Sequence, residues 1–190
     1  MSRFIEQCRF LGALARSPKT TGAVAPSSRY LADMMVRSVN RNCDDPILEL
    51  GPGTGAITNA IVAKSGSADR LTCVEYEERL ASKLAARFPQ ATVLQGDAFE
   101  LEALPQLRRN VPFGCVISSL PLLNFDPAKR QKLLESVMSL LPPGGAFVQF
   151  TYGFSAPVQN DRLEATIDTS PWVLRNLPPA RVWTYIKEGA

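Results

Sequence analysis

The feature that most constrains the fold is a regular alternation of short β-rich runs with helical patterns, which begins at Pro46. Five runs have the apolar, β-branched composition of buried strands, namely Pro46–Leu50, Leu71–Glu75, Thr92–Gln95, Phe113–Ser118 and Ala146–Tyr152. Helical patterns occupy the segments between them, at 54–65, 77–88, 98–109 and 127–141. Strands that alternate with helices in this way form βαβ units. The chain is therefore predicted to be an α/β protein whose parallel sheet is covered by helices on both faces.

The last part of the chain predicts two further strands. Residues 153–170 have a polar, loop-like composition, and then Trp172–Leu177 and Arg181–Lys187 flank Pro178-Pro179. Two short runs joined by a tight turn are typical of an antiparallel hairpin, and prolines at that turn leave the strand register open. The expected sheet has seven strands, of which five are parallel and two form the C-terminal hairpin.

Two amphipathic segments, 3–16 and 28–41, are predicted to form extra helices ahead of the sheet. The second places its apolar side chains on one side, which favours packing against the core. The first is apolar on one face and basic on the other, so it suits either packing on the core or lying in a membrane interface. The whole chain, 1–190, is expected to be a single domain with a basic N-terminal part at 1–41 and a catalytic core at 46–190.

Charge is unevenly distributed along the chain. The formal net charge is +3, but residues 1–41 carry +5 and residues 42–190 carry −2. A local basic patch favours phosphate-bearing partners, either nucleic acid or anionic lipid. The chain has no histidine, which excludes Ser-His-Asp and Cys-His catalysis, and its four cysteines are widely spaced. We therefore expect reduced thiols in a cytoplasmic protein and no metal site.

The strongest chemical signal is the segment Glu49-Leu50-Gly51-Pro52-Gly53-Thr54-Gly55, at the end of the first predicted strand. Glycines there permit a tight turn and let a ligand approach the N–H groups at a helix N-terminus. Read through Ala56, the segment also fits a dinucleotide-binding fingerprint. The carboxylate of Glu49 would repel a pyrophosphate, whereas it can bind the ammonium group of a ligand.

Two more acids end the next two predicted strands. Glu75 lies some 20 residues after Gly55, where a carboxylate can accept both hydroxyls of an adenosine ribose. Asp97, in Gly96-Asp97-Ala98, can accept a hydrogen bond from an adenine amino group. Because the carboxyl ends of parallel strands meet at one edge, the three acids are expected to converge on one crevice.

This order of motifs resembles the class I S-adenosylmethionine-dependent methyltransferases, which have a Rossmann-like fold. The resemblance covers about residues 46–190 and implies S-adenosylmethionine as cofactor and S-adenosylhomocysteine as product. It implies that Glu49 and Gly51–Gly55 hold the methionyl part, that Glu75 holds the ribose, and that Asp97 with Ala98 holds the adenine. The candidate cofactor contacts also include Pro52, Gly53, Thr54, Tyr76, Gly96, Ser118, Ser119 and Leu120.

A narrower resemblance rests on the segments Lys19–Ser28, Ser118–Phe125, Gln149–Gly153 and Pro178–Trp183, which are similar to those of bacterial phospholipid N-methyltransferases. It implies stepwise methylation of phosphatidylethanolamine, and of its mono- and dimethyl products, to phosphatidylcholine. It also implies a cytoplasmic protein that is peripherally associated with the membrane.

The alternatives are an enzyme that methylates ribosomal RNA adenine and a non-catalytic adenosyl-binding module. The RNA enzymes carry N-L-P-Y after the fourth strand, where this chain has Ser119-Leu120-Pro121-Leu122. An aromatic side chain stacks on a flipped-out base, and Leu122 cannot do so. No nucleic-acid partner is therefore expected.

Methyl transfer to an amine is an in-line displacement that depends on orientation and on an uncharged amine. The candidates for the head-group pocket are Tyr30, Tyr152 and Asn124, and the proton acceptor stays open between a tyrosine, a carboxylate and water. Aromatic faces there can stabilise the methylated ammonium. Lys19 or Arg29 is expected to meet the lipid phosphate. The helix at 3–16 is expected to meet the membrane through Arg3, Phe4, Arg9 and Arg16.

Overall fold

A computed structural model describes residues 27–39, 45–107, 111–159 and 164–189. The predicted helix at 3–16 lies outside the described residues, and so do the candidate contacts Arg3, Phe4, Arg9, Arg16 and Lys19. In the described part, no helix has both the length and the apolar character needed to cross a membrane.

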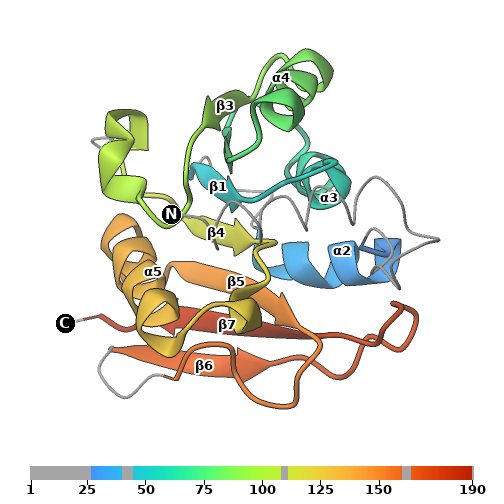
Figure 1. The fold of residues 1–190 in the computed structure, drawn as a ribbon, viewed down its shortest axis with the longest axis vertical. Coiled ribbons are helices and arrows are strands. Elements are labelled where there is room, and N and C mark those ends of the chain that lie inside the picture. The colour runs from blue at the N-terminus through green and yellow to red at the C-terminus, as the bar shows by residue number, and fades with distance from the viewer. Residues whose placement is uncertain (1–26, 40–44, 108–110, 160–163, 190) are drawn as a thin grey trace.

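The core is a seven-stranded sheet with the order β3-β2-β1-β4-β5-β7-β6 (Figure 1). Its strands are β1 (Ile47–Leu50), β2 (Leu71–Glu75), β3 (Thr92–Gln95), β4 (Cys115–Ser118), β5 (Ala146–Thr151), β6 (Ala165–Thr169) and β7 (Arg181–Lys187). The first five strands are parallel, and β7 pairs antiparallel with both β5 and β6. The predicted seven-stranded sheet, with five parallel strands and a C-terminal antiparallel pair, is confirmed.

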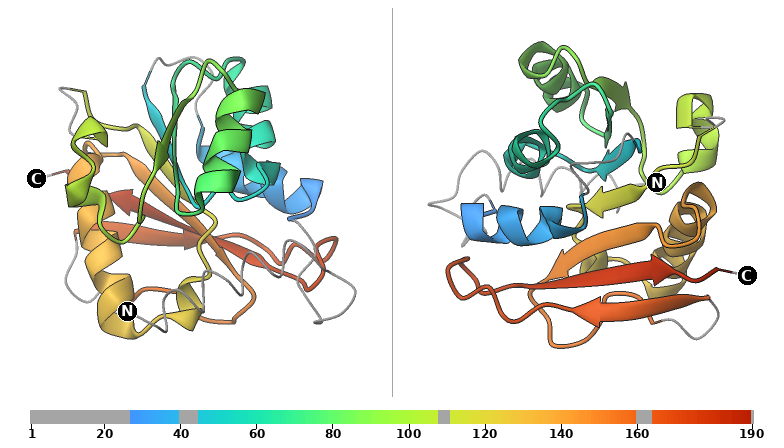
Figure 2. Two further views of the ribbon diagram at one scale, coloured as in Figure 1. Left: turned by 45° about the horizontal axis from the view of Figure 1, so that its top comes forward. Right: turned by 180° about the vertical axis from the view of Figure 1, so that it is seen from behind.

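Helices cover both faces of the sheet, as Figure 2 shows. One face carries α2 (Arg29–Met35), α3 (Ala56–Ser65) and α4 (Glu78–Arg87), and the other carries α5 (Pro127–Leu140). Side chains alternate between the faces along each strand. In β1, Leu48 and Leu50 belong to the hydrophobic cluster beneath α5, whereas Ile47 belongs to the cluster beneath α2 and α3.

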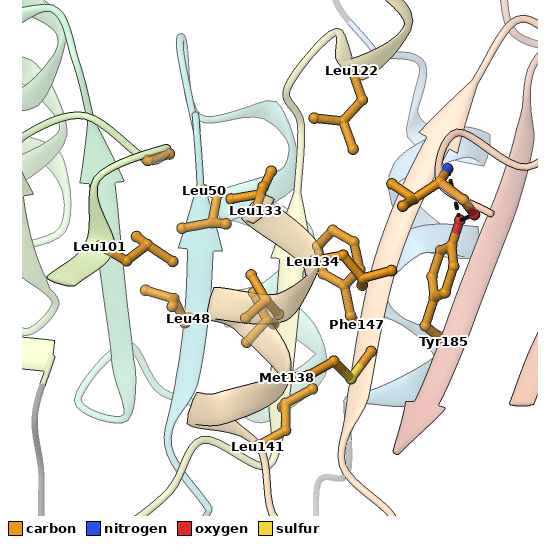
Figure 3. Close-up of a cluster of buried hydrophobic side chains, with 14 of the residues drawn as sticks. Leu48, Leu50, Leu101, Leu122, Leu133, Leu134, Met138, Leu141, Phe147 and Tyr185 are labelled. Atoms are coloured by element: carbon orange, nitrogen blue, oxygen red, sulfur yellow. Dashed lines mark hydrogen bonds between the residues drawn. The ribbon is translucent and has the colours of Figure 1, made fainter. Parts of the chain in front are cut away.

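The α5 face is the larger of the two cores (Figure 3). Leu133, Leu134 and Met138 of α5 pack against β1 and against Phe147 of β5. The buried Tyr185 of β7 closes this core, because its hydroxyl donates to the Val158 carbonyl oxygen at 2.7 Å and accepts from the Val158 N–H at 3.1 Å. The loop after β5 is thereby fixed to β7.

The helix α5 begins and ends almost where the sequence predicts. Asp126 caps its N-terminus by accepting from the Lys129 N–H at 2.8 Å, and Pro127 occupies the first turn. The helix ends at Leu140, one residue earlier than predicted, before Pro142-Pro143. The second predicted N-terminal helix is also present but short: α2 spans Arg29–Met35 and is followed by the 3₁₀ helix η1 (Val36–Ser38).

The prediction of an α-helix at 98–109 is wrong. The described residues there form two 3₁₀ helices, η2 (Leu101–Ala103) and η3 (Pro105–Leu107). Pro105 lacks a backbone N–H and disfavours the α conformation at Leu104, so a continuous α-helix cannot run through this segment.

The first strand of the predicted hairpin is also misplaced. The strand that pairs with β7 is β6, with Ala165 opposite Lys187 and Thr169 opposite Trp183, and it replaces the predicted Trp172–Leu177. Residues 170–180 form the connection instead, closed by an isolated bridge between Val173 and Ala180. Because β6 is an edge strand with only Ala165 buried, it has no apolar pattern to reveal it.

Truncating Leu134 tests the α5 core. Leu134 is fully buried, so Leu134→Ala should lower the free energy of unfolding by about 2–5 kcal/mol. The exposed Lys132 on the same helix is the control, and Lys132→Ala should change it by less than about 0.5 kcal/mol. Urea unfolding of both variants measures the difference, and equal effects would contradict the packing.

Candidate active site at the carboxyl edge of the sheet

The register of the parallel strands brings five loops to one edge. Leu50 of β1 lies beside Val74 and Ser118, and Glu75 lies beside Gln95, so neighbouring strands end together. The antiparallel β7 starts at this same edge, because Arg181 pairs with Thr151 at the end of β5. The edge therefore carries the glycine loop, the loops after β2 to β5, and residues 170–180.

The glycine loop after β1 needs glycine at two positions for different reasons. Gly51 has a φ of +67°, and a Cβ there would lie 2.7 Å from Leu120 Cδ2, so the loop after β4 packs directly on it. Gly53 has a φ of +57°, and a Cβ there would meet nothing within 4 Å. The side of the loop at Gly53 is thus open to a ligand.

Glu75 joins the glycine loop to the end of β2. One carboxylate oxygen accepts from the Gly53 N–H at 2.9 Å, and the other accepts from the Glu77 N–H at 3.0 Å. The side chain is only 7% exposed. Each oxygen keeps a further lone pair, so the carboxylate can still accept from two ligand hydroxyls.

Glu49 is a fully buried acid beneath the same loop. Its Oε2 accepts from Thr58 Oγ1 of α3 at 2.8 Å and from Cys73 Sγ at 3.7 Å. Its Oε1 has no hydrogen-bond partner among the described residues. Burial raises the pKa of Glu49 to about 7, which the hydrogen bonds from Thr58 and Cys73 oppose and the nearby charge of Glu75 reinforces. A cationic ligand group would supply the missing partner and favour the ionised form.

The predicted adenine-binding segment follows β3. The Gly96 N–H donates to the Glu75 carbonyl oxygen at 2.9 Å, which places Asp97 next to the end of β2. Asp97 Oδ1 accepts from the Phe99 N–H at 2.8 Å, and Ala98 is buried. Tyr76 is 40% exposed at the same edge.

The loop after β4 is held by a residue that sequence reasoning missed. Gln149, fully buried in β5, donates through Nε2 to the carbonyl oxygens of Leu120 at 2.9 Å and Phe150 at 2.8 Å. Ser118 Oγ accepts from the Leu120 N–H at 3.3 Å. Gln149 Oε1 and Ser119 Oγ are buried without hydrogen-bond partners in the described structure. The available signal was a polar residue inside an otherwise apolar strand.

Tyr30 and Tyr152 each contact one of two adjacent residues, Arg175 and Asn176, in the β6–β7 loop. Arg175 donates to the Tyr30 hydroxyl at 3.0 Å, and its guanidinium carbon lies 4.9 Å from the centre of the Tyr30 ring. The buried Asn176 accepts from the Ser28 N–H at 2.9 Å and hydrogen-bonds to Tyr152. Sequence reasoning missed Arg175 and Asn176, because Tyr30 and Ser28 lie almost 150 residues away in the chain.

The chemistry available to Tyr152 and Asn124 follows from their surroundings. Burial raises the pKa of Tyr152, although the hydrogen bond with Asn176 opposes the shift, so this phenol stays protonated near neutral pH. Tyr152 can orient a ligand rather than act as a phenolate base. Asn124 is exposed on the 3₁₀ helix η4 (Leu122–Asn124), and this helix lies beside the turn after Tyr152, because Leu123 Cδ1 is 3.1 Å from where a Cβ at Gly153 would be.

Leu122 has a different environment from its neighbour Asn124. Its side chain is 1% exposed and belongs to the hydrophobic cluster beneath α5, as Figure 3 shows. It therefore offers no surface to a ligand at the edge. In the described part of the chain, no three His, Cys, Asp or Glu side chains come together as a group that could hold a metal ion.

Comparison with known proteins identifies relatives that match different lengths of the chain. A family profile described as a methyltransferase domain matches residues 47–145. The ornithine lipid N-methyltransferase of Singulisphaera acidiphila is 31% identical over 180 residues, which are 90% of this chain and 91% of that protein. The ribosomal RNA small subunit methyltransferase A of Chlorobium phaeobacteroides is 39% identical over 115 residues, which are 60% of this chain and 40% of that protein.

Solved structures share the fold at low sequence identity. An RNA methyltransferase from Salinibacter ruber, in complex with S-adenosyl-L-homocysteine, aligns with a TM-score of 0.56 and 20% identity over 87% of this chain and 96% of that chain. The N-methyltransferase NodS from Bradyrhizobium japonicum aligns with a TM-score of 0.59 and 11% identity over 85% of this chain and 96% of that chain.

The buried carboxyl of Glu49 predicts a pH-dependent cost in the ligand-free protein. Because its pKa is raised from 4.5 to about 7, its contribution to stability is full below pH 4.5 and is lost as the pH rises through 7. Glu49→Gln cannot ionise. We therefore expect its free energy of unfolding, relative to that of the wild type, to rise between pH 5 and pH 8 by at most about 3 kcal/mol.

Thermal and urea unfolding at pH 5 and pH 8 measure this difference in the free energy of unfolding. The exposed Glu102 provides the control, since Glu102→Gln removes a carboxylate without changing a buried site. An equal stability change for Glu49→Gln at both pH values would contradict a buried, proton-binding carboxyl.

Proposed function

The chain belongs to the class I S-adenosylmethionine-dependent methyltransferases, and from this we propose that it transfers methyl groups from this cofactor to the amine of a membrane lipid. The observation that carries the lipid substrate is the extent of similarity to the ornithine lipid N-methyltransferase, which runs through 90% of this chain. The match to the ribosomal RNA enzyme from Chlorobium phaeobacteroides covers only 60% of this chain.

The position that separates the two substrate classes supports the same proposal. An enzyme that acts on a flipped-out base needs a planar side chain to stack on it. The residue in question here is Leu122, which is aliphatic and packed into the core. A lipid amine makes no such demand.

We propose phosphatidylethanolamine as the acceptor, together with its mono- and dimethyl products, which leads to phosphatidylcholine. An ornithine lipid is the competing acceptor of the same chemical class, since the relative from Singulisphaera acidiphila is named for it. The reaction is proposed to take place at the cytoplasmic surface of the membrane, with the enzyme peripherally bound.

The carboxyl edge offers groups that fit the cofactor. When bound, S-adenosylmethionine supplies an activated methyl group on a sulfonium. Glu49 Oε1, which is buried and unpartnered among the described residues, would accept from the cofactor's ammonium group. Glu75 would accept from the ribose hydroxyls, Asp97 from the adenine amino group, and the open side of Gly53 would leave room for the ligand.

The acceptor amine is proposed to bind between the two tyrosines. Tyr30 presents a ring that is 37% exposed beside the guanidinium of Arg29, whose carbon lies 5.1 Å from the ring centre. Arg29 and Arg175 both lie over this ring, so these arginines would meet the lipid phosphate beside the acceptor amine. The protonated Tyr152 holds the head group. Because its phenol keeps its proton, water or a carboxylate accepts the proton of the amine.

Alanine at Gly51 and at Gly53 separates folding from cofactor binding. Both substitutions strain a positive φ, but only Gly51→Ala also collides with Leu120. We expect Gly51→Ala to lose more stability, and Gly53→Ala to weaken S-adenosylmethionine binding at least about tenfold while losing only about 1 kcal/mol of stability. Calorimetric titration and urea unfolding of both variants measure the two effects, and unchanged binding by Gly53→Ala would contradict the placement of the cofactor.

Labelled S-adenosylmethionine tests the substrate class directly. The purified full chain is supplied in parallel with vesicles that contain phosphatidylethanolamine, vesicles that contain an ornithine lipid, and ribosomal RNA. We expect label in the phosphatidylethanolamine vesicles, and loss of at least about 90% of the rate for Tyr30→Ala with unchanged cofactor affinity. Label in RNA alone, or in no acceptor while the cofactor binds, would overturn the lipid proposal.

A further inference from the structure

The three most exposed large apolar side chains of the described residues lie on two adjoining loops. Leu174 is 75% exposed and Leu177 is 77% exposed in the β6–β7 loop, and Phe154, in the loop after β5, is 85% exposed. Trp172 joins the two loops, because its ring lies 5.2 Å from that of Phe154 in an edge-on contact. Leaving side chains of this size in water costs free energy that a partner would recover.

This group of residues lies at the same edge of the sheet as the glycine loop. The β6–β7 loop leaves β6 after Thr169 and returns to β7 at Arg181, which pairs with Thr151 at the carboxyl end of β5. Figure 1 shows the loop beside the start of α2, where Arg175 contacts Tyr30. The exposed apolar residues therefore adjoin the proposed head-group pocket.

The chain segments that form this region carry only positive charge, and the nearest described acids along the chain are Asp33 in α2 and Asp168 in β6. The stretches 27–32, 151–159 and 170–181 contain Arg29, Arg175 and Arg181 and no carboxylate. Arg181 lies over the Trp172 ring at 5.6 Å, and Arg29 lies over the Tyr30 ring. Apolar tips with arginines and aromatic rings behind them match a bilayer interface, where acyl chains lie below a layer of phosphates.

We propose that the β6–β7 loop (170–180) and Phe154 form a docking surface that inserts Leu174, Leu177 and Phe154 into an anionic phospholipid bilayer. This inference rests on the proposed lipid substrate and is separate from the membrane contact expected of residues 3–16. The Ser28 N–H is bound to Asn176 of this loop, so the N-terminal end of α2 lies beside the docking surface.

Docking in this orientation would turn the carboxyl edge toward the membrane. A lipid head group could then reach Tyr30 and Tyr152 without leaving the interface, because Arg175 and Asn176 connect these tyrosines to the loop. The arginines would hold the phosphate plane while the leucines occupy the acyl region. The loop would thus set the depth at which the amine meets the cofactor.

Charged substitutions at the loop tips test the docking surface in the full chain. In Leu174→Asp/Leu177→Asp both side chains are exposed, so we expect unchanged thermal stability and unchanged S-adenosylmethionine affinity. Binding to vesicles of phosphatidylethanolamine and phosphatidylglycerol should weaken at least about tenfold. The matched control is Val111→Asp, a 55% exposed apolar residue before β4 at the opposite edge, which should bind as the wild type does.

Trp172 reports the contact from within the loop. The chain has two tryptophans, and in a Trp183→Phe background the emission of Trp172 should be quenched by lipids with brominated acyl chains. Vesicle binding without quenching would overturn the proposal, as would wild-type vesicle binding by the leucine variant. A dimer that dissociates in the leucine variant would assign the surface to a second copy of the chain and overturn it as well.

A soluble short-chain phosphatidylethanolamine separates docking from catalysis. The double variant Leu174→Asp/Leu177→Asp should methylate this soluble lipid at the wild-type rate. On vesicles its rate should fall at least about tenfold. If the wild type methylates neither form of the lipid, the proposed function fails. Co-sedimentation with vesicles and quenching of Trp172 still decide whether the surface docks. Equal losses on both forms would show that the leucines act within the site and would overturn the docking role.

Discussion

The carboxylate of Glu75 is the interaction on which the rest of the site depends. It ends β2 and accepts from Gly53 of the glycine loop and from Glu77 before α4, so one side chain holds two crossovers together. Its backbone carbonyl also accepts from Gly96 after β3. These bonds form only because parallel pairing makes neighbouring strands end at one edge. A shift of register would separate the acids from the loop that they serve.

How far the sequence predicts the structure depends on whether a residue's role is local. The strands β1, β2, β4 and β5 are recognised because both of their faces pack, so they read as short apolar runs. The edge strand β3 is only half-buried, and it is recognised by its β-rich run Thr92-Val93-Leu94. The edge strand β6 is missed because solvent leaves its composition polar, and the helix at 98–109 fails at Pro105. Glu49, Glu75 and Asp97 are found because strand ends are visible in the pattern. Asn176 is missed because its contact with Ser28 is long-range, whereas Gln149 has a visible signal, a polar residue inside an apolar strand, that does not indicate its partner Leu120.

The burial of Glu49 is a cost that the fold alone does not require. An apolar residue at this position would fill the same space between β1 and α3 without a desolvated carboxyl. The acid is partly satisfied by Thr58 and Cys73, and its Oε1 has no described partner. An unsatisfied buried oxygen next to a ligand-facing loop is explained when the ligand brings the missing donor. Cofactor binding should then release a proton near neutral pH, because the ammonium favours the ionised form.

The antiparallel insertion of β7 between β5 and β6 explains why membrane docking and chemistry would share one edge. A sixth parallel strand in that place would begin at the amino ends of β1 to β5, so the loop before it would lie away from the glycine loop. Because β7 runs against β5, the loop that precedes it lies beside the end of β5, next to Phe154 and to the two tyrosines Tyr30 and Tyr152. The net positive charge of the sequence is confined to residues 1–41, and the fold adds Arg175 and Arg181 to the edge where α2 begins. The topology of the sheet thus brings together Arg29, Arg175 and Arg181, which are far apart in the chain.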